Sequence, residues 1–421
     1  MTLPRASARP ELAPRGYPAA APPEPSDPLR VLKIAPTSFF ADYGCHVRIL
    51  EETLAIQRLG ARAAICTYPG GRDVFGLDVR RSAGAPWGNG VRVGSSYHRL
   101  YLDGFLGAQV AWTALRFRPD LIHAHLHEGA LIGLPIARAL GVPLLFDFQG
   151  SLTSEMLDHE FIARDSPFVR PLRWLERRIN LRADLILTSS LNAAELLVEQ
   201  FGVPAGRVQP VPDAVDAERF APRWSYSEAE RARLRHQLGV PIDARLIVYL
   251  GLLAEYQGSG HLLRAAARLC ARRPDVHFLL MGYPGQRRYQ EYAELLGIGQ
   301  RVTFTGRVPY EQAPAHLALG DVAVSPKLSE TEGNGKLLNY MAVGLPTVTF
   351  DTPVSREILG PLGRFARLGD DVALADELER LLDDPQHDRI AQALRQRALE
   401  RFSWLDAGRR IVDAYRTMVE R

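Results

Sequence analysis

Short apolar runs alternate with amphipathic segments along the chain. In the first half the runs lie at residues 31–35, 62–67, 120–123, 144–147, 185–188 and 208–211. Segments with the apolar spacing of helices lie between them, at 44–59, 106–117, 130–140, 171–182 and 191–201. Runs as continuously apolar as these are typical of parallel strands covered by helices on both faces, so this half predicts an α/β domain.

The alternation resumes after a proline-flanked connection at 213–223, which we expect to be a hinge. A helix is predicted at 227–238, and strands are predicted at 246–250, 277–281, 302–305, 322–325 and 347–350. From about residue 385 the pattern is helical to the end of the sequence.

One pattern occurs twice in the chain. Residues 120–147 and 321–351 each run from an apolar strand through a helix to a Gly-x-Pro turn and a strand that ends in Asp. Because a repeated βαβ unit indicates a repeated fold, the sequence predicts two similar α/β domains. The length of 421 residues agrees, since one hydrophobic core rarely extends beyond about 250–300 residues.

Composition narrows the class of protein. The apolar content of 46% is that of a globular protein, and the net charge of +3 argues against dedicated nucleic-acid binding. Three cysteines without metal-ligand spacing favour a reducing, cytoplasmic setting. No apolar run approaches the roughly 18 residues of a membrane span. Residues 1–29, rich in Pro and Ala, predict a disordered tail and not a signal peptide.

The loop that follows run 322–325 concentrates polar chemistry. It reads SPKLSETEGNGK and places two glutamates and two glycines between Lys327 and Lys336. Glycines let a backbone approach a ligand, a helix N-terminus offers N–H groups to an anion, and carboxylates accept hydrogen bonds from sugar hydroxyls. Only three lysines occur in the chain, and two of them flank this loop. The loop suits a sugar nucleotide; on these residues alone, a solvated loop with a helix cap is an equal alternative.

Seven further segments resemble, in their order and spacing, a family-four glycosyltransferase. They are GCHVRILEETLAIQRLG (44–60), DLIHAH (120–125), ADLILTSS (183–190), VQPVPDAVDAERF (208–220), YLGLLAEYQG (249–258), VTFTGRVPYEQ (302–312) and FSWLDAGRRIVDAY (402–415). The resemblance covers about residues 30–421. It implies an α/β fold of the GT-B type, in which two Rossmann-like domains with parallel sheets face a central cleft.

The same resemblance implies which substrate each domain binds. An acceptor domain would occupy 30–215, a nucleotide-sugar donor domain 216–403, and the last helix, within 404–421, would return to the first domain. The implied reaction moves a sugar from a nucleotide-diphosphate donor to an acceptor, with retention at the sugar carbon. It needs no metal and no cofactor, because the nucleotide sugar is a co-substrate.

The donor site departs from the family pattern at two cations. The pattern has an Arg and a Lys in the segment 249–258, and this chain has Leu252 and Gln257 there. Losing such charged contacts costs roughly 1.5–3 kcal/mol each, so Lys327, Lys336 and the helix N-terminus would have to hold the diphosphate. The resemblance places on the donor side Lys327, Thr331, Gly333, Asn334, Gly335, Lys336, Asn339, Gln257, Gly282 and Arg307.

The family's pair of glutamates is altered as well. The second acid, which holds the ribose hydroxyls, aligns with Asn339, whose amide can do the same. The first aligns with Thr331, between Glu330 and Glu332. We expect one of these glutamates, with Glu332 preferred, to contact the donor sugar and stabilise an oxocarbenium-like transition state.

The acceptor side is expected to carry Gly44, His125, His127, Gln149 and Gly150. Gly44 stands where the family has two glycines, and Gln149 replaces a His near the donor sugar. Alternation along a strand would place His123, His125 and His127 on one face, with His125 or His127 facing the cleft. A metal site is not predicted, because the only nearby acid, Glu128, would point the other way and no cysteine is close.

Residues 168–182 contain five arginines and Trp174 on an amphipathic pattern. A solvated helix with Leu172, Leu175 and Ile179 facing the core is the preferred interpretation. A peripheral contact with the inner face of a membrane is the alternative.

The sequence therefore favours a cytoplasmic glycosyltransferase acting on a glycan, lipid-linked or small-molecule acceptor. Two alternatives stay open. A degenerate GT-B subunit would bind a sugar or a partner glycosyltransferase without catalysis, and the missing Arg/Lys pair is its main support. A sugar-nucleotide epimerase or a phosphorylase would share the fold; a pyridoxal-dependent phosphorylase would need Lys327 or Lys336 as its cofactor lysine.

Overall fold

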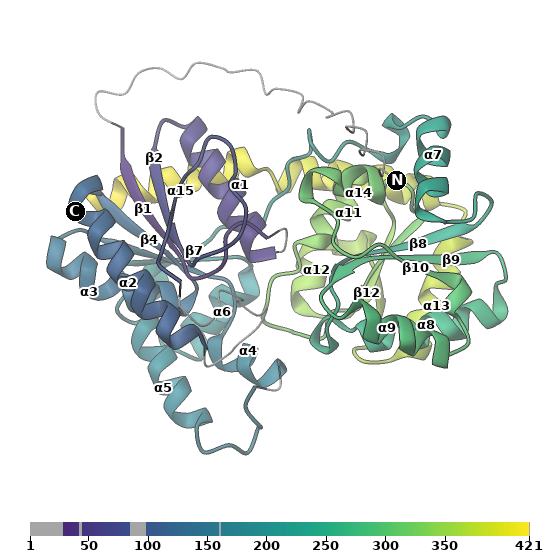
Figure 1. The fold of residues 1–421 in the computed structure, drawn as a ribbon, viewed down its shortest axis with the longest axis horizontal. Coiled ribbons are helices and arrows are strands. Elements are labelled where there is room, and N and C mark those ends of the chain that lie inside the picture. Colours follow the sequence, from purple (N-terminus) through teal and green to yellow (C-terminus); the bar gives the residue numbers. More distant parts are fainter. Residues whose placement is uncertain (1–27, 42–43, 85–97, 160, 421) are drawn as a thin grey trace, which may run out of the picture.

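The computed structural model describes residues 28–41, 44–84, 98–159 and 161–420. They form two α/β halves side by side, each built on its own parallel sheet (Figure 1). The tail predicted at 1–29 lies almost wholly outside the described residues. Within the described ranges, no helix is long and apolar enough to cross a membrane.

The first sheet has seven strands, and all paired neighbours run parallel. Their order is β3 (Asp78–Arg81), β2 (Arg62–Thr67), β1 (Arg30–Ala35), β4 (Leu121–His125), β5 (Leu144–Phe148), β6 (Leu185–Thr188) and β7 (Val208–Pro210). The apolar runs predicted six of these within two residues at each end. Strand β3 was missed because its sequence, DVRR, is polar and it lies at the sheet edge.

Helices cover both faces of this sheet. In chain order they are α1 (Gly44–Arg58), α2 (His98–Phe117), α3 (Leu126–Leu140), α4 (Leu152–Asp158), α5 (Val169–Asn180) and α6 (Leu191–Glu199). The apolar sides of α2, α3, α5 and α6 share one core with the strands. The other face is covered by α1 and by the last helix, α15 (Trp404–Val419), which packs on α1.

The second sheet has six parallel strands. Their order is β10 (Val302–Phe304), β9 (Val276–Tyr283), β8 (Arg245–Leu252), β11 (Val322–Ser325), β12 (Thr347–Phe350) and β13 (Arg364–Ala366). The helices of this half are α7 (Glu228–Leu238), α8 (Ser259–Arg272), α9 (Gln286–Leu295), α10 (Ala313–Leu317), α11 (Lys336–Val343), α12 (Pro353–Leu359), α13 (Asp371–Leu382) and α14 (His387–Arg401). Helices α8, α9 and α13 share one core with the strands, and α10, α11, α12 and α14 share another.

The repeated turn predicted from the sequence is present in both halves. Gly141 ends α3 with φ 69°, and Gly344 ends α11 with φ 75°. Both angles are left-handed, a conformation that glycine adopts without steric cost. A proline and a buried strand follow each turn, so the two βαβ units have the same local build.

The two halves also share a hydrophobic core at their junction. Phe39, Phe40 and Ile49 of the first half belong to one buried cluster with Tyr310 and Leu317 of the second. The chain crosses here twice: Val215 forms a parallel bridge with Ser403, and its amide donates to the carbonyl of Phe402 at 2.9 Å. The outgoing connection and the returning chain thus form one joint.

Candidate active site

A cleft lies between the two halves, where the carboxyl ends of both sheets meet. Ligands gather at this edge of parallel sheets because the strand-to-helix loops open there. The first half lines the cleft with Thr37, Gly44, Cys45, Arg48, Gln149, Glu155, His159, Ser189 and Asp213, among others. The second half contributes Gln257, Gly282, Lys327, Glu332, Gly333, Asn334, Gly335, Lys336 and Asn339.

The loop from β11 to α11 forms the polar wall of the second half. Lys327 donates to the carbonyl of Gly333 at 2.6 Å and pairs with the Glu332 carboxylate at 2.7 Å. Ser325 donates to the side chain of Asn334 at 3.1 Å. These contacts hold the loop across the mouth of the sheet, and the binding of a ligand phosphate by its two lysines and its glycines stays a prediction.

Lys336 occupies the first position of α11, beside the backbone of β8. Its ammonium donates to the Gln257 side chain at 2.6 Å and lies 4.9 Å from the Tyr249 ring centroid. Burial, with the nearby Lys327 charge, lowers the pKa of Lys336 to about 7. The residue that replaced the family's lysine, Gln257, therefore positions another lysine in the same wall.

Glu332 meets the first half of the molecule across the cleft. Its carboxylate lies 3.5 Å from Nε2 of His159, whose ring stacks on Tyr256 with centroids 3.9 Å apart. Burial opposes the charge, but Lys327 and His159 outweigh it and lower the pKa of Glu332 to about 2. Burial would also lower the pKa of His159, but Glu332 and Glu155 outweigh it and raise that pKa. The Glu332 carboxylate is therefore held between the His159 ring and the Lys327 ammonium.

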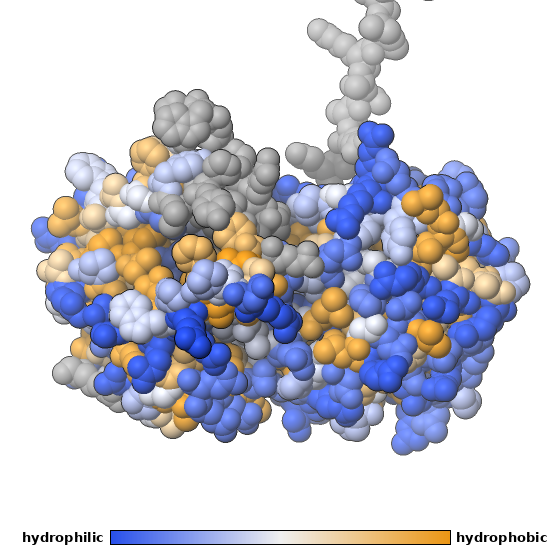
Figure 2. Space-filling view, turned by 90° about the horizontal axis from the view of Figure 1, so that it is seen from below, coloured by the Kyte–Doolittle hydropathy of each residue, from blue (hydrophilic) through white to orange (hydrophobic). Residues whose placement is uncertain are grey.

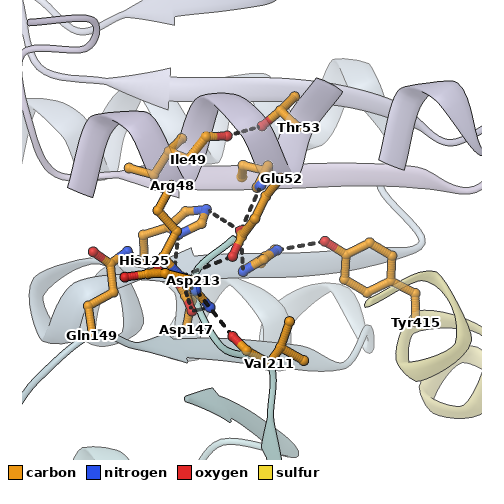
Figure 3. Close-up of polar contacts among 12 residues, drawn as sticks. Arg48, Ile49, Glu52, Thr53, His125, Asp147, Gln149, Val211, Asp213 and Tyr415 are labelled. Atoms are coloured by element: carbon orange, nitrogen blue, oxygen red, sulfur yellow. Dashed lines mark hydrogen bonds and ion pairs between the residues drawn. The ribbon is translucent and has the colours of Figure 1, made fainter. Parts of the chain in front are cut away.

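An ion network supports the wall of the first half (Figure 3). Arg48 of α1 donates to the Asp147 carboxylate at 2.7 Å and to Asp213 at 2.8 Å. Gln149 donates to the same Asp147 at 2.8 Å. Asp213 in turn lies beside the backbone of Gly333. Arg48 thereby fixes two groups that face the cleft, Gln149 and Asp213.

The histidines expected in the cleft are buried behind this network. His125 contacts Asp147 through Nδ1 at 2.9 Å, and His123 contacts the Tyr415 hydroxyl at 2.6 Å. The prediction that His125 or His127 lines the cleft is wrong: both are buried, and His127 belongs to α3 instead of the strand. Its ring packs against Phe146 and Phe148.

Two acids that are distant in sequence, Glu52 and Asp147, lie beside His123 and His125. Ligand atoms of Glu52, His123, His125 and Asp147 lie within 4.8 Å of one another, a spacing that a metal ion could use. Two cations of the chain already pair with these carboxylates: Lys33 reaches Glu52 at 3.3 Å, and Arg48 reaches Glu52 at 3.0 Å. Burial, then Lys33, lowers the pKa of His125 to about 4, so its ring is neutral. The cluster fits an internal ion network.

Three donor-side expectations do not fit the cleft. Glu330 is exposed outside it, and its backbone carbonyl accepts from Asn192, so Glu332 alone of the two glutamates reaches the site. Thr331 does not line the cleft either. Arg307 is exposed and lines a separate hollow with Arg72 and Glu311. Gly150 lies behind Glu332 and contacts its side chain.

Several cleft residues were missed by sequence reasoning. Arg48 and Asp213 come from α1 and from the connection, far apart in sequence, and only folding brings them to Gln149 and Gly333. Glu155 lies on α4 and His159 directly follows it, in a region where the sequence predicted no helix. The proline-flanked segment VPDAV around Asp213 was the one available signal, and it was interpreted as a hinge.

Comparison with known proteins identifies two domain families in this chain. Residues 43–214 match the family described as "Glycosyl transferase 4-like domain", and residues 244–384 match "Glycosyl transferases group 1". A 2-deoxystreptamine glucosyltransferase of Streptomyces kanamyceticus is 28% identical over 80% of this chain and 89% of its own length. A D-inositol 3-phosphate glycosyltransferase of Thermobispora bispora is 26% identical over 90% of both chains.

Solved structures share the fold across both halves. A sucrose-phosphate synthase from Thermosynechococcus elongatus superposes with a TM-score of 0.78 at 19% identity, covering 93% of this chain and 99% of that one. Anabaena HepE, solved with UDP and glucose, gives a TM-score of 0.74 at 19% identity over 92% of this chain and all of its own. At this level of identity the likeness concerns the arrangement of the two sheets and their helices.

Proposed function

The chain belongs to the family-four glycosyltransferases of the GT-B fold, and from this premise we propose that it transfers a sugar from a nucleoside-diphosphate donor. The observation that carries the proposal is the wall made by Lys327, Lys336 and the start of α11. Both lysines line one cleft there and no side chain caps the start of α11, an arrangement that suits a diphosphate. Relatives named for UDP, glucose and related sugars support a nucleotide-sugar donor.

The proposed chemistry assigns a role to each wall. Glu332, ionised throughout the physiological range, would stabilise positive charge that develops on the donor sugar. Gln149 and Asp213, fixed by Asp147 and Arg48, would accept and donate hydrogen bonds to acceptor hydroxyls. Gln149 cannot act as a general base, so we propose that the donor phosphate accepts the acceptor's proton and that the anomeric configuration is retained.

The first experiment is a screen of nucleoside-diphosphate sugars by thermal shift. A ligand that binds only the folded chain raises the unfolding midpoint, so the cognate donor should shift it and the free nucleoside should shift it much less. Hydrolysis or transfer of that donor, followed by NMR of the product, then reports the anomeric outcome. We propose that a chelator leaves this activity unchanged, because the reaction uses no metal and no cofactor.

The proposed function does not specify the acceptor. Two relatives are named for cyclitol acceptors, 2-deoxystreptamine and D-inositol 3-phosphate, and both classes belong in the acceptor screen beside glycans and lipid-linked sugars. If the chain binds the donor but consumes none of it with any acceptor tested, it would instead be a sugar-binding subunit. This second candidate is favoured by the uncharged residues Leu252 and Gln257, which stand where the family pattern has an Arg and a Lys.

A further inference from the structure

Helices α2 and α3 present an apolar outer surface. Phe105, Trp112 and Leu115 on α2 are 39%, 54% and 66% exposed, and they follow one side of the helix. Leu131 on α3 is 51% exposed. The exposed positions of α2 between 104 and 116 and of α3 between 131 and 140 include no acidic side chain. Large apolar side chains gathered in this way usually mark a contact surface.

The neighbouring helix α5 supplies positive charge. Its four arginines, and Arg182 just after it, are all exposed, whereas its one acid, Glu176, is buried and accepts from the amide of Thr153 at 3.0 Å. Trp174 is 60% exposed beneath Arg178, whose guanidinium lies 5.0 Å from the ring centroid. Leu175 and Ile179 turn toward the core, as the sequence predicted, whereas Leu172, predicted with them, is half-buried and outside that core.

These helices form one continuous face. Helix α3 contacts both α2 and α5, and all three pack on the same side of the first sheet. Figure 2 shows hydrophobic residues gathered on this half of the molecule. Helix α4, which carries Glu155 of the cleft and is followed by His159, packs directly on α5. The face therefore adjoins the acceptor side of the cleft.

We propose that the outer surface of α2, α3 and α5, called here the α2–α3–α5 face, docks on an anionic lipid surface. Arginines attract anionic headgroups, while Trp and Leu side chains partition into the interface, and the combination is that of a peripheral membrane protein. A symmetric pair of copies fits less well, because an isologous contact centred on α5 would bring its arginines together. Given the proposed function, docking would bring a lipid-linked acceptor to α4.

The test is flotation with vesicles of phosphatidylcholine, alone or mixed with phosphatidylglycerol. The chain should bind the mixed vesicles only, and added salt should weaken binding as it screens the charges. Arg170→Glu combined with Arg178→Glu should reduce binding by at least about tenfold, and Leu115→Glu should also reduce it. Controls on the other half, Arg287→Glu and Leu295→Glu, alter side chains that are at least as exposed as Leu115 and should bind as wild type.

Three results would overturn docking: no binding to mixed vesicles, equal binding to both compositions, or equal loss in the controls. A dimer in sedimentation that Leu115→Glu dissolves would assign the face to a second copy instead. Nucleoside-diphosphate binding is measured on the same variants, which lie outside the cleft. If it persists while vesicle binding fails, the docking proposal alone falls; if it is absent in every variant and in wild type, the proposed function falls.

Discussion

Lys336 is the side chain through which the donor diphosphate can be tested most directly. Its ammonium lies in the cleft wall and donates to Gln257 at 2.6 Å. Lys336→Ala should weaken binding of the nucleoside diphosphate about thirtyfold, since a charged contact contributes roughly 2 kcal/mol, and should leave the nucleoside nearly unaffected. Calorimetry with both ligands measures this. Equal diphosphate affinity in mutant and wild type would remove Lys336 from the site.

The same residue predicts a pH dependence of donor binding. Its pKa is lowered to about 7 in the free chain, so it is protonated below that pH and loses its charge above it. Above pH 7.5 neither ligand changes its charge: the last pKa of the free nucleoside diphosphate is about 6, and both phosphates of a nucleotide sugar are esterified. The affinity should therefore fall as pH rises, and binding should take up a proton. Calorimetry in buffers of different ionisation enthalpy detects that proton. Lys336→Arg, which keeps its charge, should abolish the uptake.

Glu332 and Asn339 should separate in kinetics. If Glu332 acts mainly in the transition state, Glu332→Gln lowers kcat with little change in the donor KM, whereas Asn339→Ala mainly raises KM. Glu330→Gln serves as the control, because Glu330 is exposed outside the cleft. A loss of kcat at Glu330 and none at Glu332 would contradict the assignment, and a loss at neither would favour a binding subunit.

Single residues of the site differed in how far the sequence revealed them. Lys327, Glu332 and Lys336 could be predicted because one loop carries them all, so local spacing alone places them together. The position of His125 was predicted wrongly. Alternation shows which face of the strand a residue occupies, but it does not show what packs on that face, and here α1 covers the face with Glu52. Arg48 and Asp213 could not be predicted, since their contact depends on packing between distant segments.

At the scale of elements, the short turn before α8 is fitted to the donor loop. Gly258 has φ 76°, and a Cβ on it would clash with the carbonyl of Pro326. Gly297 has φ 72° with open space around it. Gly297→Ala should cost only about 1–2 kcal/mol, the backbone penalty, whereas Gly258→Ala should cost more and also weaken donor binding. Denaturant unfolding and calorimetry compare the two; equal effects would mean that the close approach does not matter.

Elements with strong apolar patterns were predicted well, and their ends less well. Strands β2, β6, β11 and β12 have the predicted bounds, because a polar residue or a proline stands at or beside each end of their apolar runs. Helix α3 begins at Leu126, four residues before its predicted start, because strand β4 leads directly into it without the loop that the prediction allowed. Strand β3 is polar and helix α4 is short, so neither has an apolar pattern from which it could be predicted.

At the scale of the whole molecule, polar contacts bridge the cleft beside the shared core. Glu357 of α12 accepts from the amide of Leu191 at 3.0 Å, and Asn192 donates to the Glu330 carbonyl at 3.1 Å. His159 and Glu332 form a third bridge. Polar bridges exchange for water more readily than the shared apolar core does, so we expect the cleft side to open and close about the joint at Val215 and Ser403.

Donor binding should therefore shift the chain toward the closed arrangement. Small-angle scattering should show a smaller radius, and hydrogen exchange should slow together in residues 36–46 and 327–336. Protection limited to 327–336 with an unchanged radius would mean that the first half does not close on the donor. Gly44 and Gln149 would then leave the site, and the residues of the second half would stand.

The return of α15 to the first sheet has a consequence for biosynthesis. Trp404, Ile411 and Tyr415 cover a face that includes Val31 and Leu145, so the first half lacks part of its core until almost the whole chain has left the ribosome. The second half, by contrast, has its strands and their covering helices in one stretch. Although the first half emerges earlier, it completes its packing last. During translation its exposed face would be a natural target for chaperones.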